Sequence, residues 1–224
     1  YYKQFFFSDN QIFVEGYTDQ PMFSNFLDLT DNWYSSAGTG IIDVGGKDEL
    51  GVFFKVCSLL GTEGRIICDL DALFQGKLRD MLCEDFRPSL WLEKQQDKQE
   101  GFYRKMFSVS AIKRGISLND LITRMENYLI RIGNALCKID KELPHNVAFL
   151  VDKICNLCDK YERVEDVDTF KTVVLQGLLS IGEEIEPFLS DHIAATIPLI
   201  KNLASLIFAA AEAARVYVLP KGCI

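Results

Sequence analysis

The sequence contains few histidines and has fewer basic than acidic residues, and each shortage argues against a class of function. Only His145 and His192 occur, and neither lies beside a serine or cysteine nucleophile in a recognisable motif, so a triad hydrolase is unsupported. Lys and Arg number 24 against 32 Asp and Glu, which gives a formal net charge of −8. Because duplex DNA is bound mainly through Lys and Arg, this chain alone should bind DNA poorly unless divalent cations or a basic partner domain offset its acidity.

The sequence also shows no leader pattern at its start, has an odd number of cysteines, and contains no uninterrupted apolar run of transmembrane length. Its 7 cysteines are an odd number and no basic, apolar leader opens the chain, so we expect a reduced, cytoplasmic protein. Cys155 and Cys158 have zinc-like spacing, but no second such pair exists, and core cysteines are the favoured interpretation. The most apolar stretch, 193–211, contains Pro198 and Lys201, which favours a buried amphipathic helix over a membrane span.

Short β-rich runs alternate with helical patterns in the first part of the chain. The predicted strands are Ile12–Val14, Ile41–Val44 and Arg65–Asp69. A first helix is expected from about Thr18 to Leu29, with Pro21 in its first turn, where a missing N–H does least harm. This alternation is typical of a parallel sheet wrapped by helices, so the expected fold class is α/β.

The middle of the chain is different, because from about Lys77 to Arg215 the apolar periodicity is almost wholly helical. Ser117 followed by Asp120 predicts a capping box at the start of one helix. Gly133 and Gly177 are predicted weak points within this helical region.

A last strand is predicted at Val216–Leu219, a β-branched and aromatic run that ends at a proline. A crossover between parallel strands needs only a dozen or so residues, so the long helical region is interpreted as an insertion before that strand. We therefore expect a first part of the core at 1–76, a helical insertion at 77–214, and the last strand with a Lys-Gly turn at 215–224.

Four acidic side chains follow the ends of two predicted strands. Glu15 ends the first strand and Asp19 lies four positions later, while Asp69 ends the third strand and Asp71 follows two residues on. Ligands of open parallel sheets bind outside the carboxyl ends of the strands. Alternation along an extended chain would send Asp69 and Asp71 the same way. Since close carboxylates repel one another, the pattern predicts a site for a hard divalent cation, Mg²⁺ or Mn²⁺.

Each part of this predicted site also has a non-functional interpretation. Either acidic pair alone is more often a chance match or a solvated helix edge, and it is their combination at strand ends that favours a site. Lys221, just past the last strand, is as readily a surface lysine as a cation that stabilises charge near a scissile phosphate. Asp43 and Lys47 could also reach the site, but Gly45-Gly46-Lys47 lacks P-loop spacing, so this chain is not expected to bind a nucleotide.

Several of these motifs carry a family resemblance. The run Val14–Asp19 looks like the Toprim signature that opens with a Glu-Gly turn, Asp69–Asp71 resembles its Asp-x-Asp partner, and Val44–Lys47 resembles the glycine turn after the second strand. The order of these motifs, the long helical insertion and the run Val216–Gly222 resemble the C-terminal nuclease half of the OLD (overcoming lysogenisation defect) family. Those proteins are ATPase-Toprim enzymes of bacteria and phages, related to the Gabija defence nuclease.

The resemblance implies a Toprim-type parallel sheet and a DNA endonuclease or nickase that hydrolyses phosphodiester bonds with two divalent metal ions. Glu15, Asp19, Asp69 and Asp71 would be the metal ligands, and Glu15, Asp69 and Lys221 the catalytic residues. It also implies an N-terminal ATPase domain outside this chain, homo-oligomerisation through the full protein, no membrane partner, and a role in phage defence or DNA processing.

Two other functions stay open at this point. One is another Toprim chemistry, such as that of a primase or a topoisomerase. The other is a non-catalytic interaction domain, in which the helical insertion docks a partner and the acidic edge binds a structural ion or nothing. A further ligand for a second metal could come from the insertion, where the candidates are Asp191 and the cluster Glu183, Glu184 and Glu186, although a solvated helix face is the commoner reason for such residues.

Overall fold

The computed structural model describes residues 8–30, 38–158 and 164–220. The chain forms two compact units, one made of Tyr1–Pro88 with Ala211–Ile224 and the other of Ser89–Ala210. The first unit holds the sheet and the second is helical. A domain division at 76 and 214, as expected from the sequence, stays a prediction.

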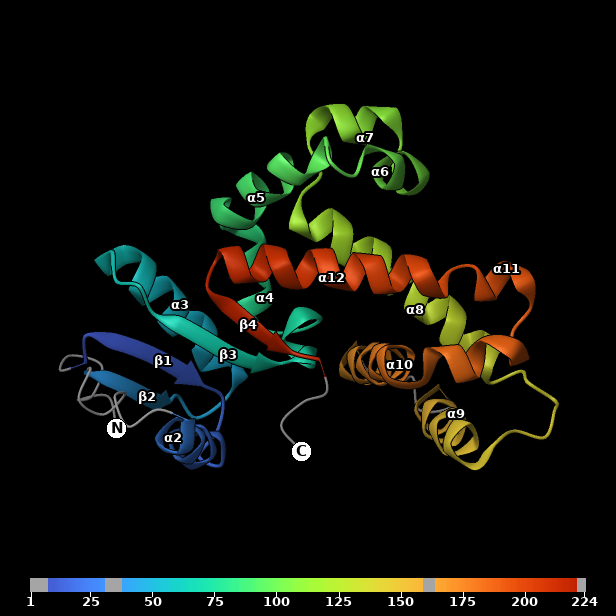
Figure 1. Cartoon of the computed structure of the whole chain (residues 1–224), viewed down its shortest axis with the longest axis horizontal. Helices are drawn as coiled ribbons and strands as arrows, with labels where there is room; N and C mark the ends of the chain where they lie inside the picture. The colour runs from blue at the N-terminus through green and yellow to red at the C-terminus, as the bar shows by residue number, and fades with distance from the viewer. Residues whose placement is uncertain (1–7, 31–37, 159–163, 221–224) are drawn as a thin grey trace. The chain divides into compact units, whose positions relative to one another are not determined.

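A parallel sheet forms the centre of the first unit (Figure 1), and within the described residues it has four strands in the order β2-β1-β3-β4. The strands are β1 (Asn10–Val14), β2 (Thr39–Asp43), β3 (Arg65–Asp69) and β4 (Val216–Leu219). All three neighbouring pairs are parallel. The predicted α/β class and the return of the chain to the sheet at its last strand are therefore confirmed.

The register of the sheet fixes which strand ends are neighbours. Val14, the last residue of β1, pairs with Asp43 of β2 and Ile67 of β3. Strand β3 continues to Asp69, which pairs with Leu219 of β4. Because parallel strands end at the same edge, the residues that follow β1 and β3 are brought side by side at the carboxyl edge of the sheet.

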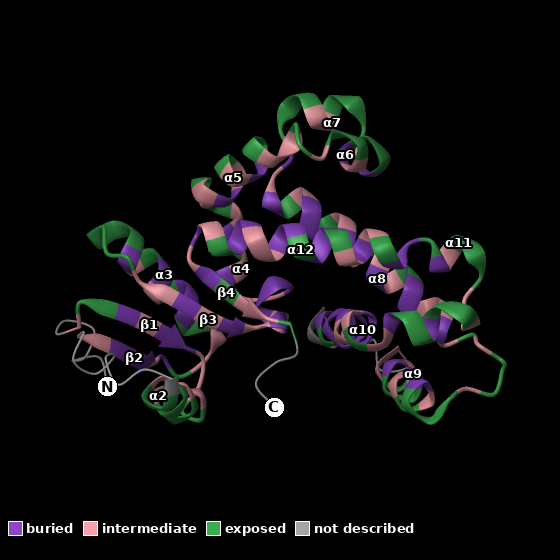
Figure 2. Cartoon of the chain, in the orientation of Figure 1, coloured by how far each residue is buried: buried purple, intermediate pink, exposed green. Residues whose placement is uncertain are grey.

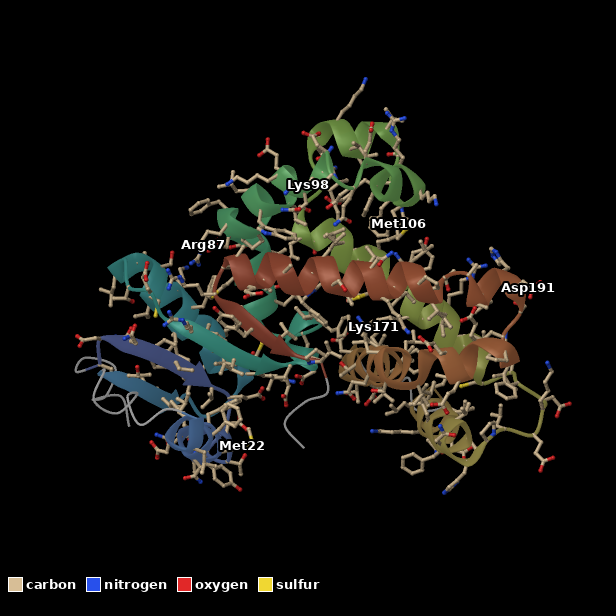
Figure 3. All side chains as sticks on the ribbon, in the orientation of Figure 1. Met22, Arg87, Lys98, Met106, Lys171 and Asp191 are labelled. Carbon is tan, nitrogen blue, oxygen red and sulfur yellow. The ribbon has the colours of Figure 1, made fainter. Side chains whose placement is uncertain are left out.

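Helices α2 (Asp19–Thr30), α3 (Lys47–Leu60) and α4 (Lys77–Glu84) follow the first three strands. Helix α3 buries Leu50 and Phe54, and the sheet buries Phe13 and Ile42, so the core lies between the strands and this helix. Helix α2 is more exposed (Figure 2), and Met22, labelled in Figure 3, lies on its solvent-accessible side.

The second unit is helical throughout the residues described, as the periodicity predicts. The Ser117–Asp120 capping box is present, since Asp120 N donates to Ser117 Oγ and Ser117 N donates to the Asp120 carboxylate. The helical elements are α5 (Phe86–Gln96), α6 (Glu100–Met106), α7 (Val109–Arg114), α8 (Leu118–Leu136), α9 (His145–Cys158), α10 (Val164–Ile185), η2 (Glu186–Phe188), α11 (Asp191–Ala194) and α12 (Ile197–Ala213).

Gly133 lies inside α8 and Gly177 inside α10, four residues before a kink at Ile181, where φ is −130° and ψ is 25°. A Cβ at Gly133 in α8 would lie 2.2 Å from the ring of Phe170 in α10. A Cβ at Gly177 in α10 would lie 2.3 Å from the side chain of Leu150 in α9. The absence of a side chain lets neighbouring helices approach closely, and both glycines therefore serve packing.

One apolar helical stretch, Asp191–Ala213, is long enough to cross a membrane by length and composition, and half of its most apolar window is buried inside the protein. Within it, α12 buries Ile200, Leu203 and Ile207 completely. The buried face accounts for the apolar composition as the core helix of a folded unit.

A buried charge cluster lies between α8 and α10 in the helical unit. Lys171, labelled on α10 in Figure 3, has its Nζ 2.6 Å from Asp168 Oδ1 and 2.7 Å from Glu126 Oε1. The three side chains are between 9% and 15% exposed. We call Glu126, Asp168 and Lys171 the buried triad. Its lysine was not predicted, because a lysine within an amphipathic helix usually indicates the solvated face.

Candidate metal centre

Glu15 is the first residue after β1 and lies at the carboxyl edge of the sheet. Its Oε2 atom is buried and makes no hydrogen bond within the described part of the chain. Burial, followed by the nearby charges of Asp71, Asp69 and Asp19, raises the pKa of the Glu15 carboxyl to about 7 against an opposing contribution from Lys47. Glu15 is therefore within electrostatic reach of all three predicted partners.

Asp69 and Asp71 are brought together by a turn and not by extended alternation. Asp69 ends β3, but the chain then enters a 3-10 helix, η1 (Leu70–Leu73), and the expected extended geometry from 69 to 71 was wrong. The apolar residues Leu70 and Leu73 are buried beneath this turn, which explains why the chain coils there. Asp71 nevertheless faces Glu15 closely enough to raise its pKa.

The two carboxylate oxygens of Asp71 have different surroundings. Its Oδ2 accepts hydrogen bonds from Lys47 Nζ at 3.1 Å and from Gln75 Nε2 at 3.2 Å. Its Oδ1 is buried and has no hydrogen-bond partner among the described residues. A buried carboxylate oxygen without a donor is costly, so Asp71 Oδ1 and Glu15 Oε2 both call for a cation or another donor.

Asp19 holds the turn between β1 and α2. Its Oδ2 accepts a hydrogen bond from the backbone N–H of Gly16 at 3.0 Å, at the first position of α2. A carboxylate is favourable at that end of a helix because it complements the helix dipole. Asp19 thus has a local structural role as well as an electrostatic contact with Glu15.

Lys47 reaches the cluster from the second strand-turn-helix unit. Gly45 and Gly46, with φ of 83° and 140°, make the turn after β2 in backbone conformations that favour glycine. Lys47 is the first residue of α3, and its ammonium contacts Asp71 with its side chain 33% exposed. The sequence indicated that Lys47 could reach the site, but not which carboxylate it contacts.

The structure does not bring the remaining predicted residues that it describes into this cluster. Lys221 lies outside the described residues, so its place is a prediction only. Asp191, Glu183, Glu184 and Glu186 are exposed on the helical unit. Glu183 lies 3.9 Å from Lys201, and Glu184 accepts a hydrogen bond from Asn146, which agrees with the solvated helix face as their usual setting.

The donor set suits a hard cation, although the side chains do not form a closed metal shell. In the ranges described, no three His, Cys, Asp or Glu side chains form a group ready to hold a metal ion. The set that faces Glu15 consists of carboxylate oxygens, which Mg²⁺ and Mn²⁺ prefer. Two carboxylate oxygens of the cluster, Glu15 Oε2 and Asp71 Oδ1, are buried without a hydrogen-bond partner among the described residues.

These features define the first unit as an α/β domain with an acidic carboxyl edge. Residues 6–71 match a family model described as the Overcoming lysogenization defect protein-like, TOPRIM domain. With this match the sheet is assigned to the Toprim-type α/β fold, accompanied by a helical part. The match indicates a metal-binding domain of the nuclease and primase kind. No curated protein and no solved structure matches the chain.

The site also contains one residue that the sequence analysis did not single out. Gln75 follows η1 and donates to the same Asp71 oxygen that Lys47 contacts. Its only signal in the sequence is a spacing of four residues from Asp71, which brings two side chains together only if the intervening turn is helical. The turn was expected to be extended, and the contact was therefore missed.

Proposed function

We propose that this chain is a DNA nuclease domain that hydrolyses phosphodiester bonds with Mg²⁺ or Mn²⁺ in a two-metal site. The observation that carries the proposal is a pair of buried carboxylate oxygens, Glu15 Oε2 and Asp71 Oδ1, that follow neighbouring strands and have no hydrogen-bond partner among the described residues. The match of residues 6–71 to the Toprim family model supports the same class of chemistry.

In this proposal Glu15, Asp19, Asp69 and Asp71 hold the metal ions. Divalent ions at such a site lower the pKa of water and stabilise the leaving oxygen of a phosphodiester. Glu15 has a pKa of about 7, so near neutral pH its carboxyl must lose a proton before it can act as a ligand. Asp19 also keeps the turn at Gly16 in place, and Gln75 donates a hydrogen bond to Asp71.

The catalytic residues proposed are Glu15, Asp69 and Lys221. An ammonium at Lys221 would stabilise negative charge that develops on the scissile phosphate. With a net charge of −8, the chain needs bound cations or a basic partner to hold DNA. We therefore infer that it works as part of a longer cytoplasmic ATPase-nuclease that forms homo-oligomers and acts in phage defence or DNA processing.

The direct test is cleavage of supercoiled plasmid at low salt by the wild-type chain, with Mg²⁺, Mn²⁺, Ca²⁺ or a chelator. Asp69→Ala and Lys221→Ala should abolish nicking while the circular dichroism spectrum stays unchanged. The matched controls are Asp97→Ala and Lys98→Ala, two exposed residues of the helical unit, which should cleave as the wild type does.

The outcomes separate the proposal from its alternatives. Full activity in Asp69→Ala or Lys221→Ala would overturn the assignment of the catalytic residues. If the wild type binds Mg²⁺ but leaves plasmid intact even with its partner domains present, a non-catalytic interaction domain is the better conclusion. Synthesis of primers, or relaxation of plasmid without net nicking, would identify a primase-like or topoisomerase-like Toprim chemistry.

A further inference from the structure

The charge balance at the carboxyl edge of the sheet depends on a single described lysine. Around Glu15, burial and three carboxylates raise its pKa, and Lys47 is the cation that opposes them. The Lys47 ammonium lies 3.1 Å from Asp71 Oδ2. Lys47 thus supplies positive charge at the point where the proposed function requires a divalent cation.

The position of Lys47 in its own helix is unfavourable. It is the first residue of α3, where the partial positive charge of the helix dipole repels a cation. The next two residues, Asp48 and Glu49, are the acidic kind that this end of a helix favours. Helix formation therefore gives no reason for a lysine at this position, whereas the contact with Asp71 does.

A single ammonium cannot satisfy the cluster. Lys47 contacts Asp71 Oδ2, while Asp71 Oδ1 and Glu15 Oε2 stay buried without hydrogen-bond partners among the described residues. A Mg²⁺ ion takes about six oxygen ligands and carries twice the charge, so it can engage oxygens that the ammonium leaves unpartnered. Exchange of the ammonium for a divalent ion would therefore lower the electrostatic cost of the cluster.

The side chain of Lys47 is free to leave. It is one-third exposed, and a lysine is a point charge on a flexible four-carbon stem, so it can turn into solvent without moving α3. Gly45 and Gly46, which precede it, have open space around the positions that a Cβ would occupy. No side chain of the described residues therefore crowds the turn before α3.

We propose that Lys47 is a built-in competitor of the divalent cation: its ammonium neutralises Asp71 until a metal ion displaces it, and it thereby sets the metal concentration at which the site fills. This inference rests on the proposed metal site and adds a regulatory residue to it. Removal of the ammonium should tighten metal binding, whereas an ordinary supporting residue would weaken binding when it is removed.

The experiment is calorimetric titration of the whole chain with Mg²⁺, repeated with Mn²⁺, in Lys47→Met and Lys47→Gln. Both variants should bind about two- to fivefold more tightly than the wild type, the range expected when one partly exposed ion pair no longer competes. Lys47→Arg keeps the charge and should bind as the wild type does. The matched control is Lys55→Met, an exposed lysine of the same helix, which should leave the affinity unchanged.

The possible results distinguish this inference from the metal site itself. Unchanged or weaker Mg²⁺ affinity in a folded Lys47→Met or Lys47→Gln protein would overturn the competitor role, while a wild-type affinity that is lost in Glu15→Gln would still support the site. If the wild type binds no Mg²⁺, or binds it equally well after Glu15→Gln and Asp71→Asn, the proposed site fails and the role of Lys47 fails with it.

Discussion

The two compact units each hold a cluster of charged side chains, and the clusters differ in how far hydrogen bonds and ion pairs within the protein satisfy them. In the helical unit, Lys171 lies 2.6 Å from Asp168 and 2.7 Å from Glu126. At the sheet edge, Glu15 and Asp71 each keep a buried oxygen without a hydrogen-bond partner among the described residues. In the first cluster Lys171 pairs with both carboxylates, whereas in the second Lys47 contacts Asp71 and leaves those two oxygens unpaired among the described residues.

The difference teaches how to separate a structural charge cluster from a functional one. A buried charge that is fully paired contributes to a unique arrangement of helices and needs no ligand. Buried carboxylates that repel each other, and that raise a pKa to about 7, persist at a cost in stability, which a ligand can recover. The helical unit also buries the Tyr103 hydroxyl, which has no hydrogen-bond partner among the described residues, but a neutral group left unpaired costs less than a charged one.

The largest effect is expected at the buried triad. Lys171→Met removes the ammonium that pairs with both Asp168 and Glu126, and the free energy of unfolding should fall by about 3–5 kcal/mol. Urea unfolding followed by circular dichroism measures this loss, which should be the same with and without Mg²⁺. Lys201→Met is the control, since that lysine is 35% exposed and 3.9 Å from Glu183, and it should cost less than about 1 kcal/mol.

A loss below 1 kcal/mol in Lys171→Met, or a loss that Mg²⁺ reverses, would break the distinction between the two clusters. Either result would mean that Lys171 does not neutralise the carboxylates of the buried triad.

A smaller loss is expected where the helical unit is packed most tightly. Gly133→Ala places a methyl group 2.2 Å from the Phe170 ring, so α8 and α10 must separate slightly, at a cost of about 1–3 kcal/mol. Thermal unfolding should show a lower midpoint. The matched change Gly101→Ala meets no atom within 4 Å, and in helix α6 it should raise the stability by up to about 1 kcal/mol. Equal midpoints for the two variants would show that the Gly133 contact is loose.

The smallest effect is a pH dependence that only the sheet edge should show. Because the pKa of Glu15 is about 7 in the folded chain and near 4.5 as a free side chain, the folded state binds more protons between those values. In chelator, the free energy of unfolding should therefore fall as pH rises from about 4.5 to about 7.

Glu15→Gln should remove this contribution, which solvent screening keeps to about 1 kcal/mol. Urea unfolding at pH 5 and pH 8 measures it, with Glu93→Gln, a change at an exposed glutamate of α5, as the control. An identical pH dependence in the wild type and Glu15→Gln would show that the Glu15 carboxyl is not under electrostatic strain.

The sequence was sufficient to predict the sheet, because each strand combines a β-branched run with a glycine or polar stop. The predicted Arg65–Asp69 and Val216–Leu219 agree with β3 and β4 in their bounds, and β1 is only extended toward its start. Hydrophobic periodicity is a local signal, and it is strong where strands are buried on both faces. The convergence of acidic residues at one edge followed from the parallel topology alone.

The features that could not be predicted from the sequence depend on contacts between residues that are far apart along the chain. The 3-10 turn after Asp69 is set by burial of Leu70 and Leu73, and it determines that Gln75 reaches Asp71. Gly133 is explained only by the position of Phe170 on another helix. The role of Glu15, Asp19, Asp69, Asp71 and Lys221 as a metal and catalytic set remains a prediction.

The central claim is that the cluster at the sheet edge is completed by a divalent cation. The most direct test is the free energy of unfolding at pH 7.5, with chelator and with Mg²⁺, in the wild type and in Asp71→Asn. Mg²⁺ should stabilise the wild type by about 2–3 kcal/mol at a concentration one hundred times its dissociation constant, and should leave Asp71→Asn nearly unchanged. No stabilisation of the wild type, or equal stabilisation of both proteins, would contradict the account.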